Sequence, residues 1–198
     1  MFRPQSTNKT AIDTECDVAA IVYNPRESPD SLLMEFATDL AAKGVRIAGL
    51  IQSGRCHGDA GLNMITYPSG TMMRVSQDLG PASTSCSLDP ARLADAAIEM
   101  RAALEAADAD LIILNRFGKL EQQGRGLRQE IVGAIEADIP VLIAVPETCF
   151  DTWIRFTGGM SVKLPCRRES LEAWWRSVSM ACTGASGSAG STFCSHAK

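Results

Sequence analysis

Short apolar runs alternate with longer amphipathic stretches along most of the chain. The runs have the length of buried strands and are flanked by turn-forming residues; they cover residues 18–22, 46–51, 111–114 and 141–145. Strands that are apolar throughout and separated by helices are typical of a parallel sheet with both faces covered. The pattern therefore predicts an α/β fold in which these runs form one mainly parallel sheet.

The amphipathic stretches carry the start signals of helices. Ser28 and Asp89 are favourable capping residues, and a proline follows each of them at the first helical position. We therefore expect helices that begin near Ser31 and Ala91, the second continuing as far as the next apolar run. Similar patterns predict helices over residues 126–138 and 169–181.

A different pattern separates the second and third apolar runs. The stretch "LNMITYPSGTMMRVSQ", residues 62–77, places Pro68, Ser69 and Gly70 between two arms with high strand propensity, which predicts a hairpin insertion. The chain ends in "CTGASGSAGSTFCSHAK", a composition typical of a flexible tail. We therefore divide the chain into a flexible N-terminus (1–16), one α/β domain (17–182) and a flexible Gly/Ser-rich tail (183–198).

Composition and charge narrow the function classes. The 198 residues, 45% of them hydrophobic, suffice for one substantial core but not for a second full domain. A net charge of −4 argues against a nucleic-acid binder that neutralises phosphates over a broad face. No apolar run approaches the roughly 18 residues that span a bilayer, and the N-terminus lacks the apolar core of a signal peptide. We expect a cytoplasmic protein without membrane insertion.

The cysteines do not indicate a metal site. There are seven of them, an odd number, and no pair has CxxC spacing, so neither a disulfide framework nor a structural zinc site is predicted. The alternative is a soft-metal site at the adjacent Cys56 and His57, whose side chains are good ligands for such ions. Adjacent residues rarely hold a metal alone, however, and we predict no metal site.

The residues after the third apolar run form a polar elbow, "NRFGKLEQQGRG". In a parallel sheet, ligands bind at the carboxyl ends of the strands, which is where this elbow lies. Glycines before the next helix allow a close approach of the backbone, and the positive end of that helix favours an anion. The elbow and its following helix supply the candidate ligands Asn115, Arg116, Lys119, Glu121, Arg125 and Arg128. In the alternative interpretation, Arg116 and Glu121 pair with each other and the glycines only shape a turn.

A second candidate segment is "RVSQDLGPASTSCSLDP". Ser76 and Gln77, together with Ser83, Thr84 and Ser85, offer neutral hydrogen-bond donors that suit a small oxyanion or a ribose. The alternative is an ordinary polar loop that closes on the capping Asp89. Cys86 lies in the same segment, but the sequence places no histidine to activate it as a nucleophile.

Together, these segments resemble the small P-loop nucleoside triphosphatases of the cancer-related NTPase type over residues 17–146. The chain is more similar to an uncharacterised bacterial family often encoded beside molybdate-transport genes. This second resemblance extends to about Trp175 and is carried by "AGLIQ", "RVSQDLGP", "CSLDP", "NRFGKLEQQGRGLRQEI", "IPVLIAVP" and "WIRFTGG". It implies a three-layer fold with a mainly parallel sheet, and a link to molybdenum.

Departures from the NTPase pattern argue against hydrolysis. A P-loop needs glycines around the phosphates, a lysine and a Ser or Thr for magnesium, whereas the matching "YNPRESPDS" has no glycine and no lysine. Where those relatives have an Asp-Glu pair for magnesium and water, this chain has Asn115 and Arg116. The resemblance therefore implies a fold that is retained while metal-assisted phosphoryl transfer is lost.

Two function classes remain open, together with a third role. The first is a non-hydrolytic binding or regulatory protein for a small anion, with molybdate or a nucleotide as the leading ligands. The second is an enzyme with weak nucleotide hydrolysis or phosphotransfer that uses Glu121 as its remaining carboxylate. The third role is that of a protein partner in molybdenum metabolism. Oligomerisation is compatible with all three, and the ligand is not identified by the sequence.

Overall fold

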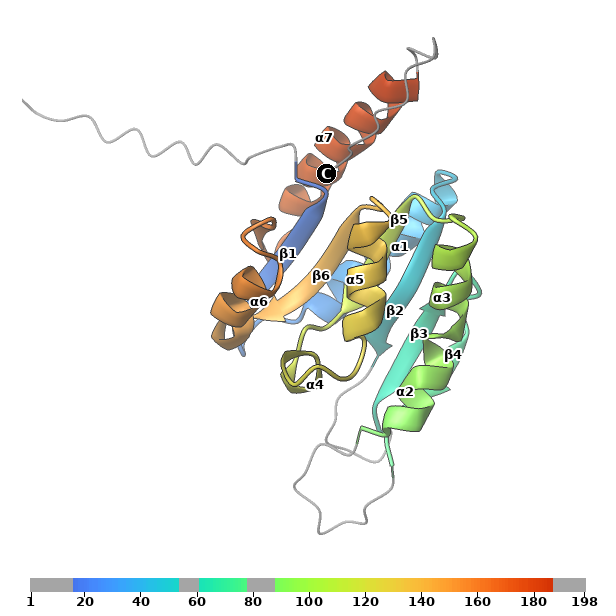
Figure 1. The fold of residues 1–198 in the computed structure, drawn as a ribbon, viewed down its shortest axis with the longest axis vertical. Coiled ribbons are helices and arrows are strands. Elements are labelled where there is room, and N and C mark those ends of the chain that lie inside the picture. The colour runs from blue at the N-terminus through green and yellow to red at the C-terminus, as the bar shows by residue number, and fades with distance from the viewer. Residues whose placement is uncertain (1–15, 54–60, 78–87, 187–198) are drawn as a thin grey trace, which may run out of the picture.

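The fold is a single sheet between two layers of helices (Figure 1). The structure is a computed structural model that describes residues 16–53, 61–77 and 88–186, with side chains as far as residue 180. Its strands are β1 (Val18–Tyr23), β2 (Ile47–Ser53), β3 (Asn63–Tyr67), β4 (Met72–Arg74), β5 (Leu111–Asn115), β6 (Val141–Pro146) and β7 (Val162–Pro165). They lie in the order β4-β3-β2-β5-β6-β1-β7.

The centre of the sheet is parallel, as the apolar runs predict. β2 pairs with β5, β5 with β6, and β6 with β1, all in parallel, so the four predicted strands share one sheet. β7 adds a further parallel strand beside β1. This strand was not predicted, because it is short and only Leu164 of its residues is buried.

The predicted hairpin is confirmed at the opposite edge. β3 runs antiparallel to β2, and β4 runs antiparallel to β3. The turn between β3 and β4 contains Pro68, as expected. The hairpin therefore extends a mainly parallel sheet by two antiparallel strands, which agrees with the predicted fold class.

Side chains alternate between the two faces along each strand, so an apolar strand presents apolar side chains to both faces of the sheet. Helices cover each of these faces. One face packs against α1 (Pro29–Ala42) and α7 (Arg168–Ser186), which contribute Phe36 and Trp174 to the core. The other face packs against α2 (Pro90–Ala96), α3 (Ile98–Glu105), α5 (Arg128–Glu136) and α6 (Phe150–Phe156), as Figure 1 shows. The connecting elements are the short α4 (Lys119–Gln122) and a 3-10 turn, η1 (Glu147–Cys149). The predicted three-layer α/β arrangement is thus confirmed.

The helices differ in detail from the predictions. The single helix expected from Ala91 is divided at Ala97 into α2 and α3, and the Arg101 guanidinium donates to the Ala94 carbonyl beside that break (2.7 Å). Asp89 caps α2 as predicted, whereas the Ser28 side chain makes no capping bond to α1. The final helix continues to Ser186, beyond the predicted residues 169–181.

Across residues 16–53, 61–77 and 88–186, every helix is too short or too polar to cross a lipid bilayer.

Candidate functional site

Polar side chains gather where the parallel strands end beside the start of α1. The carboxylate of Asp30, the second residue of α1, accepts a hydrogen bond from Asn115 Nδ2 at 2.6 Å and one from Gln52 Nε2 at 3.4 Å. Arg116 Nη2 lies 3.7 Å from the same carboxylate. The positive end of a helix attracts anions, so Asp30 acts as an internal anion at this site.

Asn115 is the most buried member of this group. It has no exposed surface, and its amide oxygen Oδ1 is buried without a hydrogen-bond partner in the described structure. A carboxylate can only accept when it is ionised, so the bond to Asp30 fixes the amide nitrogen on that side and leaves the oxygen as the free acceptor. Unsatisfied buried acceptors are rare and indicate a functional constraint or a missing partner.

Arg116 follows directly, after a cis peptide bond. Its Nε is buried without a hydrogen-bond partner in the described structure, and its guanidinium carbon lies 5.6 Å from the centre of the Tyr23 ring. Burial raises the pKa of Tyr23 to about 12, although the Arg116 charge opposes the rise. Tyr23 therefore stays neutral at physiological pH. The interpretation in which Arg116 pairs with Glu121 is not what the structure shows, because Arg116 pairs with Asp30.

The loop between β1 and α1 uses its own backbone donors. Asn24 N–H donates to the Glu27 carboxylate (2.9 Å), Arg26 N–H donates to the Asn24 side chain (2.9 Å), and Glu27 N–H donates to the Asn24 carbonyl (3.0 Å). A P-loop instead directs consecutive N–H groups at the phosphates. In this loop, those three donors already have acceptors within the loop.

The elbow after β5 is fixed by one aromatic residue and one carboxylate. Phe117 is fully buried, and its ring centre lies 5.1 Å from that of Trp153. Glu121 is also buried; it accepts from Gly118 N–H at 2.8 Å and from Leu127 N–H at 3.1 Å. Glu121 therefore holds the two ends of the elbow together and takes one of the N–H groups at the start of α5.

The other predicted site residues are not all brought together. Lys119 is exposed on the elbow and lines the same pocket as Asn115 and Arg116. Arg125 instead donates to the Gln123 side chain (2.6 Å), and the Arg128 guanidinium lies 4.5 Å from the centre of the Phe156 ring.

The second predicted segment is only partly described. Ser76 Oγ accepts from Leu62 N–H (3.0 Å), so this hydroxyl supports the hairpin. Gln77 is exposed, next to the end of the described range. The candidates Cys56, His57, Ser83, Thr84, Ser85 and Cys86 lie outside the described residues. Within the described ranges, no three His, Cys, Asp or Glu side chains are grouped in a way that could hold a metal ion.

A pocket of about 440 Å³ opens at these strand ends. Its polar side chains are those of Gln52, Asn115, Arg116, Lys119, Glu121 and Gln123. Its apolar wall includes Leu62 and Met64 from the hairpin region, Leu93 from α2, and Leu127 before α5. The predicted elbow therefore lines a pocket that combines cationic groups with an apolar wall.

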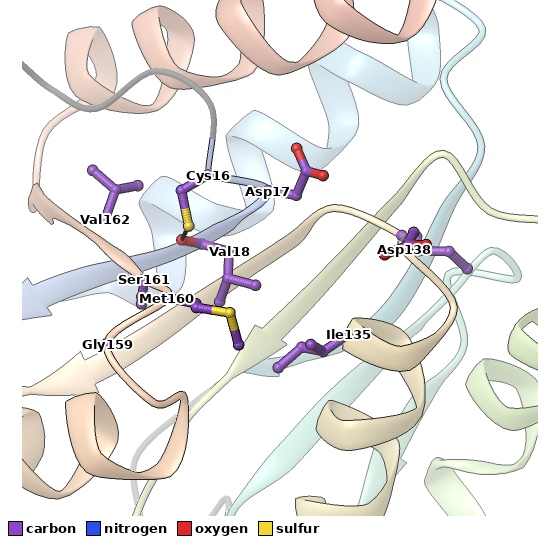
Figure 2. A pocket seen from close by; sticks show the side chains of 10 residues that line it. Cys16, Asp17, Val18, Ile135, Asp138, Gly159, Met160, Ser161 and Val162 are labelled. Atoms are coloured by element: carbon purple, nitrogen blue, oxygen red, sulfur yellow. Dashed lines mark hydrogen bonds between the residues drawn. The ribbon is translucent and has the colours of Figure 1, made fainter. Parts of the chain in front are cut away.

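A second pocket, of about 520 Å³, lies at the amino ends of β1 and β6. Figure 2 shows Val18, Met160 and Ile135 lying between the start of β1 and the end of α5. This pocket has the carboxylates of Asp17 and Asp138 in its lining, and burial together with repulsion from Asp138 raises the pKa of Asp17. Among the described residues, no lysine or arginine lines it, and its two carboxylates do not favour an anion.

Three residues at the candidate site were not predicted. Tyr23 and Gln52 were not proposed, although each lies at the carboxyl end of an apolar strand, which is the signal that could have identified them. The third is Asp30. Its pairing with Asn115 joins positions 85 residues apart and has no local signal.

Replacing Asp30 by asparagine is expected to strengthen the binding of inorganic phosphate about tenfold or more. An anion held by Arg116 would lie within several ångströms of this carboxylate, and at such distances two unit charges repel by about 2 kcal/mol in a partly screened site. Asparagine keeps an oxygen that can accept from Asn115 but removes the charge. Isothermal titration calorimetry gives the two dissociation constants.

The matched control is Asp39→Asn, which removes a carboxylate from the same helix. Asp39 pairs with Arg168, away from the pocket lining, so its replacement should leave the affinity unchanged. Weaker phosphate binding by Asp30→Asn than by the wild type would show that Asp30 positions Arg116 for the anion and does not compete with it.

The comparisons with known proteins agree with the resemblance seen in the motifs. A family model described as "Protein of unknown function (DUF2478)" matches residues 18–174. The molybdenum import ATP-binding protein ModC 2 of Bradyrhizobium diazoefficiens is 47% identical over 165 residues, which are 82% of this chain. These residues are only 18% of that protein, so the chain spans less than a fifth of its relative. No solved structure matches the chain.

Proposed function

Since the chain belongs to the DUF2478 family, we propose that it is a non-hydrolytic cytoplasmic protein that binds a small anion or a nucleotide in the strand-end pocket. The observation that carries the proposal is the buried Arg116 Nε, which has no hydrogen-bond partner in the described structure and belongs to a residue lining that pocket. A bound anion would supply the missing acceptor. Lys119, on the same pocket, would add a second positive charge.

The absence of hydrolysis is supported by the residues at the start of α1. The loop from Asn24 to Glu27 bonds its backbone donors internally, and the Asp30 carboxylate lies where a phosphate would need positive charge. We regard this loop as a degenerate P-loop. Asn115 and Arg116 likewise offer no carboxylate for magnesium.

The proposed biological role is a part in molybdenum uptake or handling. It is supported by the name of the relative, a molybdenum import ATP-binding protein, which shares 47% identity with this chain over 165 residues. Molybdate and a nucleotide are accordingly the two leading ligands, and a protein partner in molybdenum metabolism is part of the proposal. Because the chain spans 18% of that relative, the activity of the whole relative is not transferred to it.

Loss of the Arg116 side chain tests the proposal. Arg116→Ala should weaken anion binding about tenfold or more, because a charge-assisted hydrogen bond in a partly desolvated pocket is worth about 1.5–3 kcal/mol. A thermal-shift screen with molybdate, tungstate, sulfate, phosphate and nucleotides selects the ligand, since a ligand specific to the folded state stabilises it. Calorimetry with that ligand then compares the variants.

Arg92→Ala is the control for a lost surface arginine. Arg92 lies on α2, half exposed and close to Asp89, and its removal should not change the affinity. Equal affinities of wild type and Arg116→Ala would mean that Arg116 serves only as the partner of Asp30 and that the ligand binds elsewhere.

The alternative, weak nucleotide hydrolysis by Glu121, has no support in the geometry. Both carboxylate oxygens of Glu121 accept backbone hydrogen bonds, one from Gly118 and one from Leu127. We expect no turnover of ATP or GTP near 1 per second, the lower end of ordinary enzyme rates. Magnesium-dependent turnover at that rate, lost in Glu121→Gln, would establish the enzymatic alternative.

A further inference from the structure

We infer that the strand-end pocket selects an organic anion that brings its own hydrogen-bond donor, and that Asn115 is the residue that makes the selection. This inference rests on the proposed function and narrows its ligand. A fully deprotonated tetrahedral oxyanion, such as molybdate, tungstate or sulfate, would be disfavoured. A phosphorylated molecule with hydroxyl or ring N–H groups, of the size of a nucleoside monophosphate, would be preferred.

The first step is the orientation of the Asn115 amide. Amide oxygen and nitrogen can be exchanged only if their surroundings allow both orientations, and here one neighbour decides. Asp30 Oδ1 lies 2.6 Å from Nδ2 and is an acceptor, so the amide nitrogen must face it. The amide oxygen is therefore fixed as an acceptor on a residue that lines the pocket.

The second step is the missing partner of that oxygen. Asn115 is completely buried, and its Oδ1 receives no hydrogen bond in the described structure. A ligand that presents only acceptor oxygens would leave Oδ1 unpaired and would add repulsion between lone pairs. A ligand with a hydroxyl or N–H group would satisfy it, and sites built to bond such a group discriminate strongly against analogues that lack it.

Two cationic side chains and Asn115 make opposite hydrogen-bonding demands on a ligand in the pocket. Arg116 and Lys119 can only donate, so they require an acceptor, and a negatively charged group meets that need best. Asn115 Oδ1 requires a donor. A single ligand satisfies both when an anionic group and a hydroxyl or N–H group lie close together, as they do in a nucleoside monophosphate.

The volume of the pocket and its apolar wall also suit an organic ligand. The pocket measures about 440 Å³ and has an apolar wall that includes Leu62, Met64 and Leu127. That volume lies within the range of pockets for drug-sized organic ligands, roughly 300–1,000 Å³, and a bare tetrahedral oxyanion would neither fill it nor use its apolar wall. The wall instead suits the face of a ring.

The experiment is calorimetry of the full chain with sodium molybdate, sodium phosphate, AMP and GMP at one ionic strength. We expect at least one nucleoside monophosphate to bind ten times more tightly than molybdate or better. Hydrogen phosphate, which carries one O–H group, should lie between them. In Asn115→Leu, nucleotide affinity should fall about tenfold, so the preference over molybdate should be lost. Gln129→Leu, on the exposed side of α5, should leave the preference intact.

Wild-type selectivity alone decides the inference if Asn115→Leu does not fold. The inference would be overturned if molybdate bound as tightly as both nucleotides. If Arg116→Ala also lowered that molybdate affinity, the proposed anion site would remain in place. Preference for a nucleotide that persists in a folded Asn115→Leu would also overturn it. Failure of all four ligands to bind would instead overturn the proposed function.

Discussion

Gly49→Ala is expected to lower the free energy of unfolding by about 4 kcal/mol or more, a loss that few single substitutions cause. Gly49 lies in β2 opposite Ile113 of β5, and its φ of +145° is one that residues with a Cβ rarely adopt. A Cβ at this position would lie 1.9 Å from the Ile113 carbonyl oxygen. Because β2 and β5 are both central strands, the clash can be relieved only by separating these two strands. Urea denaturation followed by circular dichroism measures the loss.

Gly44→Ala separates the steric clash from the effect of positive φ. Gly44 follows α1 with φ +86°, and an added Cβ would meet no atom within 4 Å. Alanine at this site should therefore cost only the conformational strain, about 1–2 kcal/mol. Similar losses for Gly44→Ala and Gly49→Ala would show that β2 can move away from β5 at little cost.

Gly126→Ala is expected to be the second most damaging change, with a loss of about 3 kcal/mol in the free energy of unfolding. An added Cβ would lie 2.0 Å from Glu121 Oε1, the oxygen that accepts from Leu127 N–H. The carboxylate would have to move, which breaks a bond to the start of α5 and strains the one to Gly118. The positive φ of Gly126, +63°, adds to the strain. Denaturant unfolding of wild type and variant gives the difference.

Gly124→Ala is the matched control in the same elbow. Gly124 also has a positive φ, +79°, yet an added Cβ would meet nothing within 4 Å. Its replacement should cost about 1–2 kcal/mol from backbone strain alone. If both alanine variants lose the same amount, the Glu121 carboxylate can be accommodated elsewhere and does not hold the elbow together.

The fold was largely predictable from sequence because its central strands are apolar throughout. Residues 18–22 and 141–145 could be assigned without knowing their partners, since a strand covered on both faces has no polar positions. β7 lacked this signal, and the break at Ala97 lies within a continuous amphipathic pattern. At that break the Arg101 side chain donates to the Ala94 carbonyl. Neither a glycine nor a proline stands there, so no residue type in the sequence marks the break.

The position of the polar elbow at the strand ends was predictable, but the pairing of its side chains was not. Strand ends in a parallel sheet meet at one edge, and Asn115 and Arg116, expected at that edge, line a pocket there. That a ligand binds in this pocket stays a prediction. The pairing of Arg116 with Asp30 depends on how α1 returns to the sheet, which is a tertiary contact. The structural role of Glu121 could have been recognised from its neighbours. At a helix start, a glutamate three residues after the N-cap often accepts from the N-cap N–H, as Glu121 does from Gly118.

The position of β1 in the sheet has a consequence for synthesis on the ribosome. β1 lies between β6 and β7, and its first residue, Val18, pairs with Val141, 123 positions later in the chain. At a translation rate of about 5–20 residues per second, β1 waits roughly 6–25 s before its first partner strand is made. All six residues of β1 are buried in the finished sheet, so the nascent chain carries an apolar segment without its partner for that time. Chaperones that bind exposed apolar strands should therefore associate with nascent chains that end between β2 and β6.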